Sequence, residues 1–293
     1  MPPNNSKSAL SRQMERLRKQ VDRIDQRLLQ LLQQRTKLSG EIGRAKRRHG
    51  AEIYVPDRER LLLARVTKLA KGRLPGPAAS AIFREIMSSS RAAQGQQPIG
   101  VIVGNKPRGR SGHGHLRWRG QDQVALILRA ARCQFGACDE FAMMPDWREL
   151  SRQLRSGKLA IGLLTFDDLV IALRDPYSGG LAVIGDFRPI DGEPGLASRI
   201  FVVKPAPDVQ TGNRALILIE CKPTANAVKS RITSMPRAPK LIEMTLLPGR
   251  ARPASSLAAL TFSEPIGHEA LTANGKPLGL VLGIYTTDES HGG

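Results

Sequence analysis

The sequence has few cysteines and no long apolar segment. Its three cysteines, Cys133, Cys138 and Cys221, form no C-x-x-C pair, so we expect buried free thiols and no zinc site. No apolar run approaches the ~18 residues that indicate a membrane span. The first residues, MPPNNSKSALSRQ, lack the apolar segment of a signal peptide. These absences predict a cytoplasmic protein with no membrane partner.

The chain is also short of acidic residues. It has 26 Asp and Glu against 45 Lys and Arg, which gives a formal net charge of +19. Residues 1–95 hold 21 basic and 8 acidic residues, so +13 of this charge lies in the first third of the chain. Such a basic region favours anionic partners, which range from nucleic acids to carboxylate metabolites. With 293 residues at 41% hydrophobic, the chain can build one large core or two to three modest ones.

From about residue 10 to 48 the apolar residues follow a helical period. They recur at alternating intervals of three and four residues, at Met14, Leu17, Val21, Ile24, Leu28, Leu31, Leu38, Ile42 and Ala45. Only Arg35 interrupts this apolar face. A helix of this length is roughly 60 Å long and must be covered by an equally long element. A second copy of the chain is the simplest such element.

Two shorter helices are predicted to follow the long one. Gly50 and Pro56 bracket a connection, and helices are expected over residues 57–71 and 78–94, with LPGP at 74–77 between them. The N-terminal part of the chain is therefore predicted to be a three-helix unit.

Several polar residues fall on the inward faces of these helices. Arg35 and Lys46 are eleven residues apart, which brings them within about 20° of the same helix face. Ser90 and Gln94 form an i, i+4 pair that continues the apolar face of the third helix. A guanidinium, an ammonium, a hydroxyl and an amide can therefore point towards one pocket.

Arg58 and Glu59 open the second helix, where the connection delivers them close to the end of the first. Each of these polar residues also has a structural explanation. A lone arginine in an apolar face can snorkel, form a buried salt bridge or fix the register of a coiled coil. Polar residues near helix ends are commonly solvated. Taken singly, none of them decides between a structural and a functional role.

Taken together, their order and spacing resemble the all-helical (AroQ-type) chorismate mutases. The resemblance covers about residues 10–95 and runs through LRKQVDRIDQRLLQLLQQR, EIGRAK, the Arg58-Glu59 pair and IFREIMSSSRAAQ. It implies an intertwined homodimer in which the first helices of two chains pair lengthwise and each site borrows an arginine, here Arg18, from the other chain. It also implies that one chain supplies the rest of the pocket: Arg35, Lys46, Arg58, Glu59, Ser90 and Gln94.

The resemblance implies the rearrangement of chorismate to prephenate, with no cofactor and no metal. Arg35 and the borrowed Arg18 would clamp the two carboxylates of the substrate in a compact conformer. Lys46 and Gln94 would donate to the ether oxygen, where negative charge grows as the C–O bond breaks.

The remaining residues of the pocket have supporting roles in this family. Glu59 would accept a hydrogen bond from the substrate hydroxyl, Ser90 would bind a carboxylate, and Arg58 would add positive charge. Many relatives carry Asp where this chain has Val55, so one hydrogen bond to the substrate hydroxyl is missing or supplied elsewhere.

After residue 96 the pattern changes to alternating strands and helices, which predicts an α/β region over 97–210 and a βαββαβ plait over 211–293. Strands are expected at 99–103, 159–165, 181–187, 199–204, 214–222, 240–248, 257–265 and 278–286, and helices at 121–136, 145–157, 225–232 and about 268–273. The basic segment 104–120 is predicted to be a loop, with an RNA-contacting arm as the alternative. His113 and His115 within it have no nearby carboxylate or cysteine, so we expect no metal there.

The order of these three domains (1–96, 97–210 and 211–293) is similar to that of P-proteins, in which prephenate dehydratase and an ACT regulatory domain follow the mutase. After residue 97 the motifs of these proteins are only partly present. Ser198 and Arg199 stand for the first two residues of the dehydratase Thr-Arg-Phe motif, but Thr165 to Asp168 replace its Asn-Ser motif, and the Glu-Ser-Arg-Pro signature of the ACT domain is absent.

We therefore predict a multi-domain α and α+β protein that is a chorismate mutase with a degenerate dehydratase/ACT-like region, where an amino-acid effector is a candidate ligand. One alternative is a bifunctional mutase and dehydratase. A further alternative is a non-enzymatic basic binding protein on the same scaffold. The presence of Glu59 and Gln94 among the arginines argues against nucleic acid as the partner.

Overall fold

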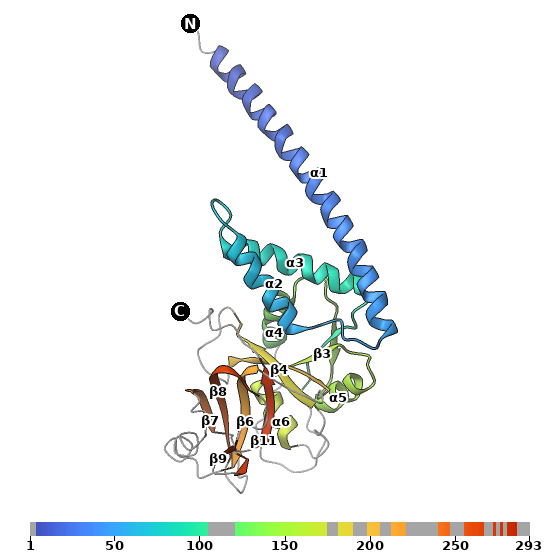
Figure 1. Ribbon diagram of the computed structural model, residues 1–293, viewed down its shortest axis with the longest axis vertical. Helices are drawn as coiled ribbons and strands as arrows, with labels where there is room; N and C mark the ends of the chain where they lie inside the picture. The colour runs from blue at the N-terminus through green and yellow to red at the C-terminus, as the bar shows by residue number, and fades with distance from the viewer. Residues whose placement is uncertain are drawn as a thin grey trace.

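A computed structural model describes most of the chain. The described residues are 4–104, 121–174, 181–189, 198–205, 212–220, 240–246, 255–266, 272–273, 276–277 and 280–285. They form an N-terminal unit of three helices above a body that contains two larger sheets (Figure 1). Among these residues, no helix is both long enough and apolar enough to cross a membrane.

The three predicted N-terminal helices are confirmed: α1 (Asn4–Arg48), α2 (Pro56–Leu69) and α3 (Gly76–Gln94). α3 packs against α1 and α2. The N-terminal half of α1 extends away from this contact as a single rod (Figure 1). A Cβ atom at Gly43 would lie 2.6 Å from the Cα of Gln94, so glycine permits the close approach of α1 and α3.

The α/β unit that follows is a five-stranded sheet with the strand order β2-β1-β3-β5-β4. The strands are β1 (Ile99–Ile102), β2 (Phe141–Met144), β3 (Ile161–Thr165), β4 (Leu181–Phe187) and β5 (Ile200–Pro205). β1 runs parallel to β2 and β3, whereas β5 is antiparallel to both β3 and β4. The central strand β3 and its neighbour β1 are fully buried or nearly so, as expected for a sheet covered on both faces.

Helices cover both faces of this sheet. They are α4 (Gln121–Phe135), α5 (Trp147–Arg155) and α6 (Phe166–Arg174). One core cluster joins Ala131 and Phe135 of α4 to Val101 of β1. Another joins α5 and α6 to the opposite face, where Ile102 points. Successive residues of β1 therefore serve opposite faces, which follows from the period of two in a strand.

A second sheet is formed by β6 (Gly212–Glu220), β7 (Lys240–Leu246), β8 (Ser255–Ile266) and β11 (Leu280–Tyr285). Its strand order is β11-β6-β8-β7 and all its pairings are antiparallel. β11 lies against β4 of the first sheet. A Cβ atom at Gly283 would lie 1.9 Å from the carbonyl oxygen of Val183, so the two sheets meet where only glycine fits.

The structure corrects several expectations for the second half of the chain. A short antiparallel pair, β9 (Thr272–Ala273) and β10 (Lys276–Pro277), lies where the helix over about 268–273 was expected to end, so that helix is wrong at its C-terminal residues. β2 and α6 were not predicted. The helix expected over 225–232 and residues 105–120, including His113 and His115, lie outside the described residues.

The thiols also differ from expectation. Cys133, in the last turn of α4, and Cys138, three residues after α4, are exposed rather than buried. Cys221 lies outside the described residues.

Candidate functional site

Arg35 of α1 points towards α3. Its Nη1 atom donates to the carbonyl oxygen of Ile86 at 3.1 Å and also to the hydroxyl of Ser90. The Ser90 hydroxyl donates in turn to Ile86 at 2.7 Å. Burial lowers the pKa of Arg35, and the positive charge of Arg58 lowers it further. A half-buried guanidinium therefore lies between two helices, where a carbonyl and a hydroxyl rather than a carboxylate accept these hydrogen bonds.

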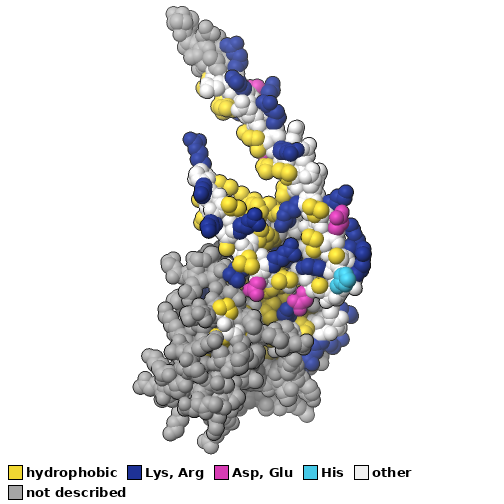
Figure 2. Space-filling model, in the orientation of Figure 1, with side chains coloured by type: hydrophobic (Ala, Val, Ile, Leu, Met, Phe, Trp, Pro, Cys, Tyr) yellow, Lys and Arg dark blue, Asp and Glu magenta, His cyan; other side chains and the backbone are white. Residues whose placement is uncertain are grey.

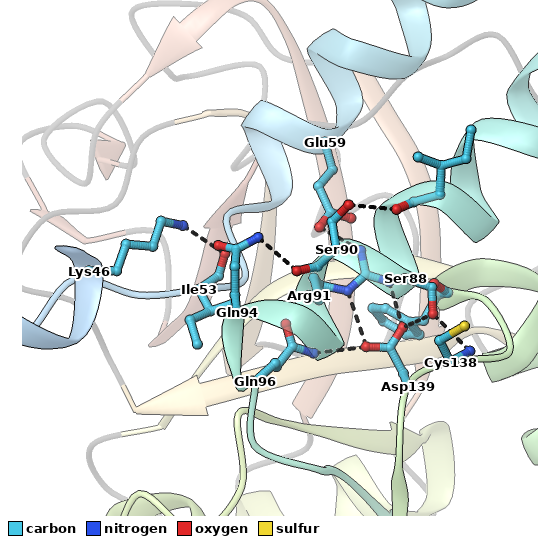
Figure 3. Close-up of polar contacts among 12 residues, drawn as sticks. Lys46, Ile53, Glu59, Ser88, Ser90, Arg91, Gln94, Gln96, Cys138 and Asp139 are labelled. Carbon is cyan, nitrogen blue, oxygen red and sulfur yellow. Dashed lines mark hydrogen bonds and ion pairs between the residues drawn. The ribbon is translucent and has the colours of Figure 1, made fainter. Parts of the chain in front are cut away.

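Lys46 lies near the C-terminal end of the same helix. Its Nζ atom donates to the carbonyl oxygen of Ile53, in the connection between α1 and α2, at 2.9 Å (Figure 3). Burial lowers the pKa of Lys46, as does the charge of Arg58, whereas Glu59 and Glu52 act in the opposite direction. These mutual effects mean that Lys46, Arg58 and Glu59 belong to one electrostatic group.

Gln94 closes α3 on the side that faces α1. Its Nε2 atom donates to the carbonyl oxygen of Ser90 at 3.1 Å. Its Oε1 atom is buried and has no hydrogen-bond partner among the described residues. Arg47 of α1 donates to the backbone carbonyl of Gln94 and fixes the end of α3 against α1. A buried amide oxygen without a partner is costly, so this end of α3 has unused hydrogen-bonding capacity.

Glu59 lies in the first turn of α2, which Pro56 begins. Its Oε1 atom accepts a hydrogen bond from Nη1 of Arg91 at 2.6 Å. Burial raises the pKa of Glu59, and the ion pair with Arg91 offsets this only in part. Val55 is the N-cap residue of α2, and its side chain makes no capping hydrogen bond.

The structure brings six of the seven predicted residues to one end of the helical unit, where α1, α2 and α3 meet. The seventh, Arg18, is exposed on the projecting half of α1. It is seventeen residues before Arg35, or roughly 25 Å along the helix axis. Arg18 is therefore not part of the group of polar residues that its own chain assembles.

The projecting half of α1 exposes the apolar residues of the predicted helical face. Leu17, Val21, Ile24, Leu28 and Leu31 are 46–60% exposed. Figure 2 shows both hydrophobic and Lys and Arg side chains along this helix, with further Lys and Arg side chains where α1 meets α2 and α3. Arg35 lies on the same helical face as these apolar residues, so the apolar stripe leads into the cationic group.

Sequence reasoning missed Arg91 and Asp139. Arg91 is 2% exposed and lies between Glu59 and Asp139, whose carboxylate it binds at 2.6 Å (Figure 3). Arg91 directly follows Ser90 in the sequence and lies four residues after the buried Met87. Nothing in the sequence pattern links it to a carboxylate 48 residues later.

The arrangement can bind and polarise a small anion. Three cations, Arg35, Lys46 and Arg58, interact here, and Glu59 and Glu52 place carboxylates near Lys46. Within the described part of the chain, no three His, Cys, Asp or Glu residues are grouped so as to hold a metal ion. The chemistry that these residues offer is charge complementarity and hydrogen bonding.

Residues 17–95 match the family model described as chorismate mutase type II. This N-terminal region is therefore a chorismate mutase type II domain. The bifunctional chorismate mutase/prephenate dehydratase of Aquifex aeolicus is 40% identical over 81 residues, which are 26% of this chain and 22% of that protein. The T-protein of Enterobacter agglomerans is 36% identical over 101 residues, or 31% of this chain and 27% of that protein. The chain thus spans about a quarter of the length of these curated relatives.

Two solved structures show weaker overall similarity. Chorismate mutase (form II) from Thermus thermophilus is 35% identical, with a TM-score of 0.28, and the match covers 29% of this chain and 97% of that one. Prephenate dehydratase from Streptococcus mutans is 9% identical, with a TM-score of 0.37, over 64% of this chain and 97% of that one. The assignment of the N-terminal domain accordingly rests on the family model and the sequence relatives.

Proposed function

We propose that the protein is a chorismate mutase that rearranges chorismate to prephenate in aromatic amino acid biosynthesis. The observation that carries this proposal is the coincidence of two findings. The family match spans residues 17–95, and six of the seven polar side chains named by the resemblance lie where α1, α2 and α3 meet. Dicarboxylate binding explains why three cations gather there.

The rearrangement is intramolecular and needs no external nucleophile. In our proposal Arg35 and Arg18 of the partner subunit hold the two carboxylates of chorismate, which selects the compact reactive conformer. Ser90, which already accepts a hydrogen bond from Arg35, binds one of the same carboxylates. Arg58 adds positive charge in the first turn of α2.

Lys46 and Gln94 stabilise the transition state in this mechanism. Negative charge develops on the ether oxygen as its bond to the ring breaks, and two preorganised donors lower the energy of that charge. The ammonium of Lys46 is held by the carbonyl of Ile53, and the amide of Gln94 is held by its own helix. Both groups exchange these bonds for the substrate oxygen. Glu59 accepts a hydrogen bond from the substrate hydroxyl.

A homodimer completes this site. The apolar stripe of α1 is exposed over more than four turns, and a solitary helix with such a face is unfavourable in water. Lengthwise pairing with the same helix of a second chain covers the stripe. It also carries Arg18 of the partner subunit towards the cations that one chain assembles, and an isologous two-fold contact makes two such sites.

The rest of the chain is proposed to be a degenerate dehydratase-like unit (97–210) followed by an ACT-like plait (211–293), after the mutase domain (1–96). The strand order β11-β6-β8-β7, antiparallel throughout, supports the plait because it is the order 4-1-3-2 in chain sequence. An amino acid is the effector class that such a plait would take. The bifunctional alternative is favoured by the names of the relatives, several of which are mutase/dehydratase proteins.

A chorismate time course tests these alternatives. Purified protein is incubated with chorismate, and prephenate and phenylpyruvate are quantified separately. Accumulation of prephenate is the expected result. Phenylpyruvate would instead establish the bifunctional enzyme, and unchanged chorismate would refute the mutase and direct attention to Val55.

A further inference from the structure

Arg91 links the proposed mutase site to the α/β unit through a buried chain of ion pairs. Its Nη1 atom donates to Oε1 of Glu59 at 2.6 Å. Its Nη2 and Nε atoms donate to the two oxygens of Asp139 at 2.6 and 3.2 Å, which is a bidentate pair. Arg91 is 2% exposed and Asp139 is 9% exposed. One guanidinium on α3 therefore holds a carboxylate of the helical unit and a carboxylate of the segment that follows α4 (Figure 3).

The carboxylate of Asp139 is held from several directions. It accepts hydrogen bonds from the hydroxyl of Ser88 at 2.7 Å and from Nε2 of Gln96 at 3.1 Å, in addition to both bonds from Arg91. Arg91 also donates to the carbonyl oxygen of Phe135, the last residue of α4. With so many partners, neither side chain can rotate without leaving a buried polar group unpaired.

The connection between α1 and α2, which precedes Glu59, also rests on the α/β unit. The ring of Tyr54 meets that of Phe135 edge to face, with centroids 5.7 Å apart. The Nζ atom of Lys204 on β5 lies 2.5 Å from Oε2 of Glu52. The α/β unit thus contacts two segments that carry residues of the proposed site: the connection between α1 and α2, and the end of α3.

We infer that Arg91 and Asp139 are positioning residues of the mutase reaction, through which the α/β unit holds the Glu59 carboxylate in its working orientation. This inference rests on the proposed function. Burying an arginine and two carboxylates costs desolvation free energy, which is offset only while all three are paired. Loss of Asp139 would therefore act on Glu59 through Arg91, which binds both carboxylates.

The charges around Glu59 give this inference a signed consequence. Lys46 faces it from α1, Tyr54 from the connection, Arg91 from α3 and Asp139 from the segment after α4. Burial raises the pKa of Glu59, Arg91 lowers it and Asp139 raises it. The fall of kcat/KM at low pH, its acidic limb, reports groups that titrate in the free enzyme. Removing Arg91 should therefore move this limb to higher pH, and removing Asp139 should move it to lower pH.

The test uses the full chain and measures kcat and kcat/KM for chorismate against pH. In Asp139→Asn the acidic limb is expected at lower pH than in the unsubstituted protein, with kcat reduced by about tenfold to a hundredfold because Glu59 is less well held. In the double variant Arg91→Met/Asp139→Asn, which leaves no buried charge of this pair unpaired, the limb is expected at higher pH. This is expected because Arg91 lowers the pKa of Glu59 by more than Asp139 raises it.

Asp186→Asn is the matched control. Asp186 is a buried carboxylate of the same α/β unit and is paired with Arg199 at 3.1 Å. It also contacts Arg214 and Tyr285, which belong to the second sheet and not to the helical unit. Its variant should keep the mutase pH profile and kcat of the unsubstituted protein.

Arg91→Lys, which keeps the charge but not the bidentate contact, should keep the acidic limb near its original pH while kcat falls.

Two results would overturn the inference alone: acidic limbs that do not move in either Asp139 variant, or equal losses in the Asp186→Asn control. Turnover by the unsubstituted chain would stand in both cases, so the proposed function would survive. If the unsubstituted chain does not convert chorismate, the proposed function fails and the positioning role fails with it.

Discussion

The ammonium group of Lys46 is partly buried and interacts with Arg58 and Glu59. Lys46→Ala should lower kcat for chorismate by about 10²–10³, since removal of one donor to a developing oxyanion has effects of this size. Steady-state kinetics on folded protein, checked by circular dichroism, measure the loss. Lys158→Ala removes an exposed lysine from the α/β unit and should leave kcat unchanged. A rate close to that of the unsubstituted protein in Lys46→Ala would contradict its assigned role.

The raised pKa of Glu59 predicts how activity depends on pH. Glu59 accepts a hydrogen bond only as a carboxylate, so kcat/KM should fall as the pH drops through its pKa, at a higher pH than for a solvated glutamate. Glu59→Gln has no proton to gain and should lose this acidic limb while its activity at neutral pH decreases. Rate profiles between about pH 4 and 8 compare the two proteins. An identical limb in Glu59→Gln would assign the titration to another group.

Residues of the site differ in how far the sequence could predict them. Arg35 and Lys46 could be predicted from the sequence, because a cation in an apolar helical face is conspicuous and helical geometry places residues eleven apart on one face. The role of Arg91 could not be predicted, because its two carboxylate partners are 32 and 48 residues away in the sequence. Long-range pairing of buried charges depends on how separate units dock, and no local pattern encodes that.

At the scale of elements, the exposed stripe of α1 predicts dissociation when charge is placed on it. Ile24→Glu/Leu28→Glu should convert a dimer into monomers of 32.0 kDa, because two buried carboxylates per chain would face each other without partners. Sedimentation velocity gives the mass. Gln26→Glu/Gln30→Glu places the same charges on the opposite face of α1 and should leave the dimer intact. Monomeric unsubstituted protein would refute the paired helices.

The shared site can be tested by mixing chains. Arg18→Ala and Arg35→Ala should each be nearly inactive, because each removes one carboxylate clamp from both sites. A heterodimer of the two variants has one site with both arginines and one with neither. Equal mixing should restore about a quarter of the unsubstituted activity once chains have exchanged at random. No recovery, with exchange demonstrated by a tagged chain, would mean that Arg18 does not act across the interface.

Among the elements, those with strong periodicity were predicted and those defined by tertiary context were not. The three N-terminal helices and β4 lie where the sequence indicated. β2 is four residues long and is only partly buried, so it gives neither an alternating nor a fully apolar pattern. α6 begins at the residue directly after β3, with no turn residue between them to signal the change. Short elements of this kind are specified by the sheet they join.

The distribution of charge over the whole molecule bears on substrate capture. The chain has a formal net charge of +19, and residues 1–95, which contain the proposed site, account for +13. The positive field of such a region attracts a dianion and raises the rate of encounter. The same field would also attract nucleic acid, so charge alone does not distinguish the mutase from a basic binding protein.

Salt dependence separates these two interpretations. For a mutase, kcat/KM for chorismate should fall as ionic strength rises from about 0.02 to 0.5 M, because screening shortens the reach of the field, while kcat should stay nearly constant. A neutral viscogen is the control for diffusion. A single-stranded RNA oligomer added at stoichiometric concentration should leave kcat/KM unchanged at about 0.15 M salt, since a site built for a small dianion makes few phosphate contacts. Tight RNA binding that weakens steeply with salt and ignores chorismate would instead favour the binding protein.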